Sequence, residues 1–321
     1  MSKGNRYELS LNPSHVGRRV MIRRVTEDGP TDLVGPLVAW DGEILSVGTL
    51  DGSTLSVPYD ALVAGKVVPP APRYRRPVAP PGETSDEELE RIALLGWRAV
   101  EAQWRDGWLL RAGRGFTGRA NSALALTTPG PDLETIVDWY GARGLPAQLQ
   151  VPLPLAATLD ARLEAAGWRA HNATWVMTAQ VDVLAERLDE AVRVDEAPDE
   201  GWLASYHYRG GELPEVGKTL LMAAQTPGFA SIRDRSGEVL AIGRGACDMG
   251  WVGLTAIEVS PTFRRQGLGA RVVEGLAEWA QRRGAKYCYL QVAQSNVGAI
   301  ALYGSLGFEI HHSYVYRVLD G

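Results

Sequence analysis

The chain of 321 residues contains little cysteine and no long apolar run. Its two cysteines, Cys247 and Cys288, stand 41 residues apart outside any CxxC pair, and only five histidines accompany them. This composition predicts neither a disulfide framework nor a metal site. No stretch reaches 18 uninterrupted apolar residues and the start is polar, so we expect neither export nor membrane insertion, and a cytoplasmic protein.

A strong excess of one charge is also lacking. The 33 basic and 38 acidic side chains give a formal net charge of −5, which does not indicate a dedicated nucleic-acid binder or a polybasic membrane anchor. Hydrophobic residues make up 45% of the chain. A chain of this length and composition should fold into two or three units, each with a buried core.

Proline is concentrated in one segment. Residues 68–82 contain six prolines and cannot run as a helix or a central strand, so we expect a semi-rigid linker at 69–82. Before it, short β-branched runs at 18–25, 33–40, 44–49 and 53–58 are separated by turn pairs such as Asp41-Gly42 and Asp51-Gly52. This pattern predicts a small antiparallel barrel over residues 1–68.

The charge is divided unevenly, with a net +2 over residues 1–82 and −7 over the remainder. The first region carries a group of arginines that fits a modest basic face: Arg18, Arg19, Arg23, Arg24, Arg73, Arg75 and Arg76. Such a face is either an ordinary solvated surface or a contact for nucleic acid or an acidic protein.

After the linker, strand and helix patterns alternate, which predicts a mixed α/β architecture. We expect helices at 86–96, 132–143 and 158–166, and strands at 108–112, 123–127, 147–151 and 168–181. The last third repeats this order at an offset of 140, where Trp139 meets Trp279, Gly144 meets Gly284, and Gly167 meets Gly307. The repeat predicts a tandem duplication with halves at 83–181 and 182–321.

One segment combines a strand, a glycine-rich turn and a helix. A strand at 251–259 leads into Arg264-Arg265-Gln266-Gly267-Leu268-Gly269, where a helix begins. Glycines let a phosphate approach the backbone, while the free amides and the dipole of the first helical turn favour its negative charge. The segment predicts a phosphate-binding loop, although a glycine-rich turn alone fits an ordinary helix entry equally well.

The downstream sequence makes the motif specific. A strand at 286–292 is followed by a helix that runs from Asn296 through Ala299 and Tyr303 toward Gly307-Phe308. Together the two motifs, within residues 251–308, resemble the GCN5-related N-acetyltransferase (GNAT) superfamily. The resemblance implies an α+β mixed-sheet tandem GNAT fold, with a degenerate half at 83–181 and a catalytic half at 182–321. Residues 1–68 resemble the SH3-like barrels found ahead of some actinobacterial acetyltransferases.

The resemblance also implies residue roles. The amides of residues 265–270 would hold the CoA pyrophosphate, and the Val259 N–H would stabilise the oxyanion. Asn296 would contact the pantetheine arm, and it also fits an N-cap. Tyr303 would protonate the departing CoA thiolate, with a core tyrosine as the alternative. The implied cofactor-binding set is Ile257, Val259, Arg264, Arg265, Gln266, Gly267, Leu268, Gly269, Ala270, Asn296, Ala299 and Tyr303.

The general base is not fixed by the motif. A branch of the family that modifies protein N-termini has a glutamate at the place of Gln291, and glutamine cannot take a proton at neutral pH. Glu258 on the central strand is our catalytic candidate beside Tyr303. Other candidates are His207, Glu212, His311 and His312. Because adjacent strand residues face opposite ways, we expect at most one of the paired histidines to point inward.

The expected function is transfer of an acetyl group from acetyl-CoA to a primary amine, on a small molecule or on a protein lysine or N-terminus. The resemblance implies direct attack in a ternary complex, without a metal or a covalent intermediate. The middle half has Ala156 and Leu163 opposite Asn296 and Tyr303, so we expect only the last half to bind CoA. The alternative is a CoA-binding regulatory module whose barrel recruits protein or nucleic acid.

Overall fold

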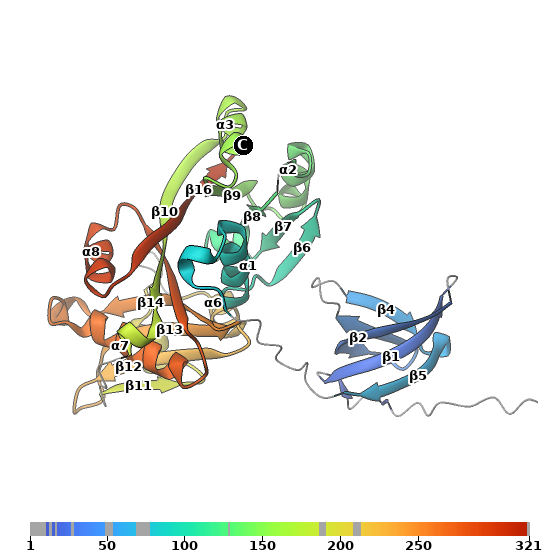
Figure 1. Cartoon of the computed structure of the whole chain (residues 1–321), viewed down its shortest axis with the longest axis horizontal. Helices are drawn as coiled ribbons and strands as arrows, with labels where there is room; N and C mark the ends of the chain where they lie inside the picture. Colours follow the sequence, from blue (N-terminus) through green and yellow to red (C-terminus); the bar gives the residue numbers. More distant parts are fainter. Residues whose placement is uncertain are drawn as a thin grey trace, which may run out of the picture. The chain divides into compact units, whose positions relative to one another are not determined.

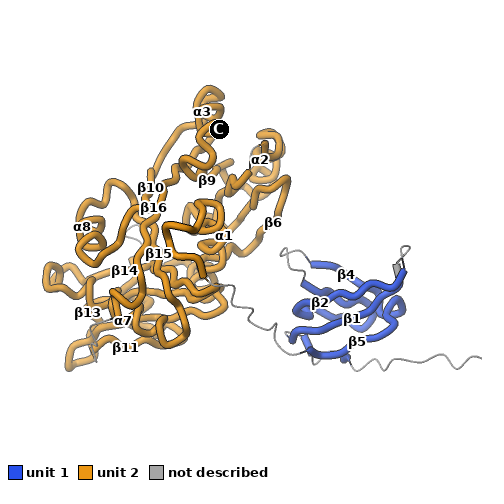
Figure 2. The backbone as a smooth tube through the Cα atoms, in the orientation of Figure 1, with its two compact units in different colours: residues 1–76 blue, residues 77–321 orange. Residues whose placement is uncertain are grey.

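The computed structural model describes residues 11–12, 15–16, 18–26, 29–48, 54–68, 78–127, 129–185, 191–207 and 213–319. The chain divides into two compact units, residues 1–76 and 77–321 (Figure 2). None of the helices in these described ranges is long and apolar enough to span a bilayer.

Unit 1 is a five-stranded antiparallel sheet in the order β4-β3-β2-β1-β5. Its strands are β1 (Arg19–Thr26), β2 (Gly29–Trp40), β3 (Ile44–Gly48), β4 (Thr54–Pro58) and β5 (Leu62–Val67). The long β2 pairs with β1 from Gly29 to Pro36 and with β3 from Leu37 to Trp40, with a register shift between Leu37 and Ala39. Within the described strands, β4 and β5 are the two edges, joined by the short 3-10 helix Tyr59–Ala61, so the sheet does not close into the expected barrel.

The sequence predicts four of the five strands of unit 1. The turn before β3 forms as the Asp41-Gly42 pair predicts, because the Asp41 carboxylate accepts the N–H groups of Glu43 and Ile44. Strand β5 was not predicted, and it contains Gly65, whose missing side chain leaves room for Leu11. A Cβ on this glycine would lie 2.7 Å from Leu11 Cδ1. The Asp51-Gly52 pair, Arg73, Arg75 and Arg76 lie outside the described residues.

Unit 2 contains one eleven-stranded mixed sheet in the order β11-β12-β13-β14-β15-β10-β16-β9-β8-β7-β6 (Figure 1). Its first strands are β6 (Glu101–Arg105), β7 (Trp108–Ala112), β8 (Ala123–Ala125), β9 (Gln148–Leu153) and β10 (Arg169–Gln180). The later strands are β11 (Val192–Asp195), β12 (Pro227–Arg233), β13 (Val239–Asp248), β14 (Trp251–Val259), β15 (Tyr287–Ala293) and β16 (Glu309–Val318). The helices are α1 (Asp86–Gly96), α2 (Leu133–Gly141), α3 (Ala157–Ala165), α4 (Val181–Leu184), α5 (Glu200–Ser205), α6 (Glu215–Met222), α7 (Leu268–Gln281) and α8 (Val297–Ser305).

The same order of elements occurs twice in unit 2. The series β7-β8-α2-β9-α3-β10 is matched by β13-β14-α7-β15-α8-β16. In both series the first two strands are antiparallel, namely β7 with β8 and β13 with β14. The second and third strands are parallel, namely β8 with β9 and β14 with β15. The last strand of each series pairs with the other series, because β10 lies against β15 and β16 lies against β9. The mixed α+β sheet that the sequence predicts is confirmed, and the exchange of strands joins its two parts into one sheet.

Helix α7 packs closely on the strands of the second series. Its buried face includes Val272 and Leu276, which lie over β13 and β14. Glycines on β13 allow this approach, since a Cβ on Gly243 would lie only 2.4 Å from Val272 Cγ1. The packing fixes the N-terminus of α7 beside the end of β14, which is where the candidate site lies.

Candidate functional site

Strands β14 and β15 separate in the middle of the sheet. Among the described residues, their parallel ladder runs from Trp251 opposite Tyr287 to Leu254 opposite Leu290. Beyond Leu254, β14 continues against β13 with a register shift, and Ala256 adopts a left-handed φ of 53°. Such backbone strain is tolerated where the surrounding structure holds it, and it often marks a functional position. The facing edges of residues 255–259 and 291–293 are therefore not bonded to each other.

The separated part of β14 presents backbone groups toward β15. Ser260 N–H donates to Leu240 O on the β13 side at 2.9 Å. Neighbouring amides of an extended strand point to opposite edges, so the N–H of Val259 points toward β15. An N–H in this place can bind a carbonyl oxygen that enters between the two strands.

The loop after β14 brings several amides to the N-terminus of α7. Arg265 and Gly267 adopt left-handed φ values of 64° and 78°, and Gly267 is the N-cap of α7. The first hydrogen bond of the helix runs from the Arg271 N–H to Gly267 O. The amides of residues 268–270 come before it and therefore have no acceptor within the helix. Residues 264–267 are exposed, and a Cβ on Gly267 would meet nothing within 4 Å. The loop has the free space and the dipole that an anion needs.

Helix α8 contacts the first turn of α7 and carries the other predicted groups. Asn296 is its N-cap and accepts the Ala299 N–H at 3.2 Å, so the N-cap role is confirmed. Gly269 of α7 lies close to α8, because a Cβ there would stand 3.2 Å from Leu302 Cδ2. Tyr303 is buried against Phe308, and burial raises the pKa of its phenol to about 12.

Glu258 and His207 lie together at the separated end of β14. The His207 N–H donates to both carboxylate oxygens of Glu258, at 3.1 and 3.2 Å, and its Nδ1 lies 3.5 Å from Oε2. Burial raises the pKa of Glu258, and the hydrogen bond from the His207 N–H opposes this shift. The structure thus joins two of the base candidates, while Glu212 lies outside the described residues.

The expectation for the paired histidines is wrong. Both His311 and His312 point to the same place, with their Nδ1 atoms 2.8 Å apart and their side chains 9% and 0% exposed. The reason is a β-bulge, since Val176 of β10 lies opposite His312 while Met177 lies opposite Ile310. The extra residue, His311, breaks the alternation of faces. The two side chains are held by residues of α1 and the segment before it.

Gln291 is held by the first series of elements. Its Oε1 accepts a hydrogen bond from Arg119 Nη1 at 2.8 Å. A small cavity beside it is lined by Glu90, Ala93, Leu94, Trp97, Arg111, Arg119, Gln150 and Gln291. Sequence reasoning missed Glu90 and Arg119. A signal for Glu90 was present, because this glutamate stands on the apolar face of α1 beside Leu89 and Ala93 and is 2% exposed.

The segment between β8 and α2 contains no Arg-x-x-Gly-x-Gly sequence. Between β8 and α2 stand Pro129 and Pro131, which have no N–H to donate, and the N-cap of α2 is the acidic Asp132. Ala156 occupies the N-cap position of α3 that Asn296 holds in α8, and Leu163 is buried where α8 has Tyr303.

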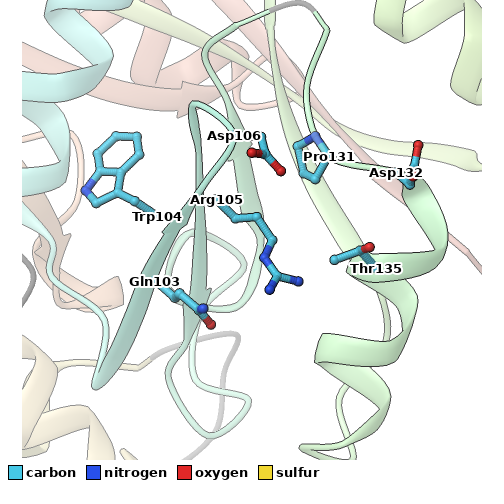
Figure 3. A pocket seen from close by; sticks show the side chains of 7 residues that line it. All are labelled: Gln103, Trp104, Arg105, Asp106, Pro131, Asp132 and Thr135. Carbon is cyan, nitrogen blue, oxygen red and sulfur yellow. The ribbon is translucent and has the colours of Figure 1, made fainter.

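A surface hollow is lined by none of the residues of β14, α7 and α8 named above. It lies between the turn after β6 and the start of α2 and is lined by Gln103, Trp104, Arg105, Asp106, Pro131, Asp132 and Thr135 (Figure 3). None of these residues belongs to the described part of the predicted site. We therefore place the candidate active site at the separation of β14 and β15.

Comparisons with known proteins identify the family of this chain. A family model described as "Probable histone acetyltransferase Rv0428c C-terminal" matches residues 84–317. The "Probable histone acetyltransferase Rv0428c" of Mycobacterium tuberculosis is 32% identical over 307 residues, which cover 92% of this chain and 93% of that protein. The "Uncharacterized N-acetyltransferase YobR" of Bacillus subtilis is 28% identical over 241 residues, which cover 72% of this chain and 97% of YobR.

A solved structure shares the fold. The GCN5-related N-acetyltransferase from Kribbella flavida superposes with a TM-score of 0.58 at 18% sequence identity, covering 73% of this chain and 95% of that one. At this identity the likeness concerns the fold alone, whereas the family match and the mycobacterial relative extend to most of the sequence. This chain belongs to the Rv0428c C-terminal family of GNAT-type acetyltransferases and is an acetyltransferase enzyme.

Proposed function

We propose that the enzyme transfers an acetyl group from acetyl-CoA to a primary amine by direct attack in a ternary complex. The observation that carries this proposal is the separation of β14 and β15 beyond Leu254, directly before the glycine loop at the N-terminus of α7. An extended thioester fits between two strand edges that are not hydrogen-bonded to each other, with its phosphates at a helix N-terminus.

The proposed donor site follows the chain from β14 to α8. The amides of residues 265–270 bind the pyrophosphate, with Arg264 and Arg265 as exposed cations beside it. The backbone of residues 257–259 binds the pantetheine arm, and Asn296 and Ala299 border the same arm from the start of α8.

The proposed chemistry needs an oxyanion donor, an acid and a base. The Val259 N–H stabilises the oxyanion that forms when the amine attacks the thioester carbonyl. Tyr303, with a pKa of about 12, stays protonated at neutral pH and gives its proton to the departing thiolate. Glu258 takes a proton from the attacking amine, and its raised pKa brings it nearer to the working pH.

The proposed mechanism has no covalent intermediate on the enzyme. Cys288 is fully buried in β15, and burial raises the pKa of its thiol well above the usual value. The pKa of Cys247 is raised to about 12 by burial as well. Neither thiol is a ready nucleophile at neutral pH, because the thiolate is the reactive form.

We propose that the acceptor enters between the two series, near Gln291 and the small cavity beside it. A protein lysine is the first acceptor to test, because the mycobacterial relative is named a probable histone acetyltransferase. A small-molecule amine and a protein N-terminus are the other acceptors in the panel. Arg119, between β7 and β8, and Glu90 of α1 then border the acceptor side of the site.

Release of CoA with a panel of lysine peptides, N-terminal peptides and small amines tests this function. We expect saturable turnover with one acceptor class. Tyr303→Phe should lower kcat about 100-fold with little change in the KM for acetyl-CoA. Gly267→Glu should raise that KM, because it places a carboxylate at the phosphate loop. Tyr287→Phe on the neighbouring strand is the control, and tight acetyl-CoA binding without turnover on any acceptor would refute the proposal.

We also propose that unit 2 is a tandem duplication, with halves at 83–181 and 182–321 after a linker at 69–82, and that only the second half binds acetyl-CoA. The prolines before α2 and the residues Ala156 and Leu163 support this. Isothermal titration should give one acetyl-CoA per chain, and a stoichiometry of two would contradict it.

For unit 1 we propose that its five-stranded sheet recruits nucleic acid or an acidic protein. Its exposed Arg18 supports such a contact, whereas Arg23 is already paired with Asp32 at 2.6 Å. Binding of DNA and of acidic peptides to the full chain should weaken in Arg18→Glu and persist in Asp60→Asn. Equal binding by both variants would remove this role.

A further inference from the structure

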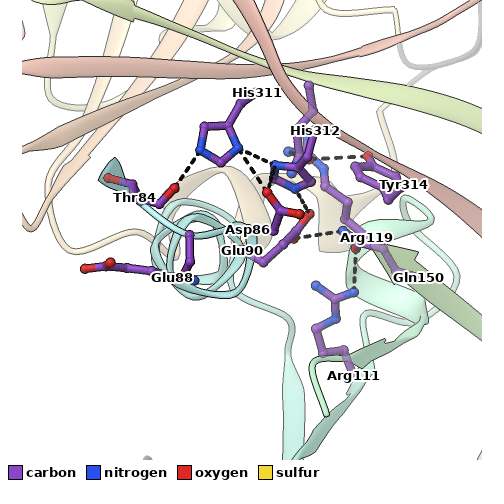
Figure 4. A network of polar contacts seen from close by, with 12 residues as sticks. Thr84, Asp86, Glu88, Glu90, Arg111, Arg119, Gln150, His311, His312 and Tyr314 are labelled. Atoms are coloured by element: carbon purple, nitrogen blue, oxygen red, sulfur yellow. Dashed lines mark hydrogen bonds and ion pairs between the residues drawn. The ribbon is translucent and has the colours of Figure 1, made fainter. Parts of the chain in front are cut away.

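A cluster of two histidines and one aspartate lies outside the residues assigned to acetyl transfer. The bulge at His311 in β16 brings the Nδ1 atoms of His311 and His312 within 2.8 Å of each other (Figure 4). Asp86, the first residue of α1, points its Oδ1 at both, at 3.5 Å from His311 and 3.8 Å from His312. Three ligand atoms thus surround one point.

The Nε2 atoms of both rings have hydrogen-bond partners, and these partners determine which ring nitrogen carries the proton. His311 Nε2 lies 2.9 Å from the carbonyl oxygen of Thr84, which can only accept a hydrogen bond. His312 Nε2 lies 3.1 Å from Oε1 of the buried Glu90, whose other oxygen accepts a hydrogen bond from Gln150. An ionised Glu90 can also only accept. Both rings therefore carry their protons on Nε2 when they are neutral.

This arrangement leaves an unprotonated Nδ1 on each ring. Two nitrogen lone pairs that face each other at 2.8 Å repel, and the carboxylate of Asp86 adds negative charge to the same point. A cation between the three atoms removes this repulsion. The cluster therefore has the electrostatics of a cation site, and its ligand atoms are the ones that metals prefer in proteins.

The distances fit a transition metal. Two atoms that ligate one tetrahedral zinc ion at its usual bond length lie about 3.3 Å apart. The three separations of 2.8, 3.5 and 3.8 Å lie on either side of this value, so small side-chain movements would equalise them. Imidazole and carboxylate ligands favour zinc over magnesium or calcium, which take oxygen ligands. The Asp86 side chain is 23% exposed and opens the site on one side.

We propose that Asp86, His311 and His312 bind a zinc ion, with water in the fourth position. Thr84 and Glu90 orient the two rings from behind, as outer hydrogen-bond partners do for zinc-bound histidines. The ion joins the start of α1 to the last strand of the sheet, between residues more than 200 positions apart in sequence. Its role is to hold α1 in place, and acetyl transfer does not depend on it chemically.

Metal binding can be measured on the full chain without a histidine tag. Protein stripped with a chelator is titrated with Co²⁺, whose visible spectrum reports coordination by nitrogen and oxygen ligands, and then with Zn²⁺ as competitor. We expect one Co²⁺ per chain, displacement by one Zn²⁺, and a higher Tm in the zinc-loaded protein. A folded native chain that binds neither ion would overturn the proposal.

Variants assign the ligands. Asp86→Asn and His311→Gln should abolish the cobalt spectrum, and Glu90→Gln should weaken Co²⁺ binding about 10- to 100-fold while keeping the spectrum. His171→Gln is the matched control, since His171 stands on β10 at the position that corresponds to His311 and contacts Gln148. Circular dichroism confirms that each variant is folded. Cobalt binding that survives in both Asp86→Asn and His311→Gln would overturn the assignment.

Discussion

Glu258 and Tyr303 both lie where burial changes their acidity. For Tyr303, burial keeps the phenol protonated, which suits a proton donor. For Glu258, burial disfavours the charged carboxylate, while the His207 N–H stabilises it. The two shifts have the same cause, and each fits the role proposed above: the phenol keeps a proton to donate, and the ionised carboxylate becomes a stronger proton acceptor.

The raised pKa of Glu258 predicts a pH-dependent effect on stability. The folded protein binds this proton more tightly than the unfolded chain does. Burial of the charged carboxylate therefore lowers the free energy of unfolding above the raised pKa, and it has no effect below the ordinary pKa of a glutamate. Glu258→Gln should therefore raise Tm at pH 8, and the gain should disappear toward pH ~4. Thermal unfolding across this range measures the effect. The exposed Glu309→Gln is the control, and a Tm gain independent of pH would contradict the explanation.

At the scale of elements, the start of α7 depends on the conformation of one residue. Gly267 has a left-handed φ of 78°, which side chains with a Cβ disfavour, yet the space around it is open. The backbone, rather than a steric contact, is therefore the reason for glycine here. The same turn directs the amides of the first helical turn outward from the end of β14.

Gly267→Ala should destabilise the protein by about 1 kcal/mol and weaken acetyl-CoA binding, because alanine must either adopt the left-handed conformation or displace the loop. Urea unfolding and titration calorimetry measure the two effects. Gly304→Ala in α8 is the matched control, since this glycine is also in open space but has a helical backbone. It should stabilise the protein by about 0.5 kcal/mol. Equal changes in the two variants would argue against the backbone explanation.

Local patterns predict most elements of unit 2, including α1 at 86–96 and β14 at 251–259 with the observed bounds. Strand β6 was not predicted, because all five of its residues are exposed and show no alternation of apolar and polar positions. The glycine loop and the Asn296 N-cap are local motifs and were predicted. The contacts of Arg119 with Gln291 and of Glu90 with His312 join distant parts of the chain, and the bulge at His311 depends on its partner strand, so none of the three follows from local sequence.

At the scale of the whole molecule, the exchange of β10 and β16 explains why unit 2 forms one body. Strand β10 lies between β15 and β16, with ladders from Thr174 to Gln180 on one side and from Arg169 to Thr178 on the other. Strand β16 in turn pairs with β9 from Ser313 to Val318. Each series thus supplies a central strand to the other, and neither can complete its sheet alone. The repeated order of elements was visible in the sequence, but strand exchange was not, because both pairings satisfy the same hydrophobic pattern.

This exchange predicts that the two series stay together after the chain is cut between them. A protease recognition sequence inserted between α4 and β11 allows the chain to be cut between the two series. The fragments should co-elute in native gel filtration and keep acetyl-CoA binding, because separating them would expose both edges of β10 and the buried side chains Val176 and Met177. The two fragments should separate only in denaturant. The uncut protein with the same inserted sequence is the control for the effect of the insertion. Two fragments that elute apart as folded proteins would mean that each series completes its own sheet.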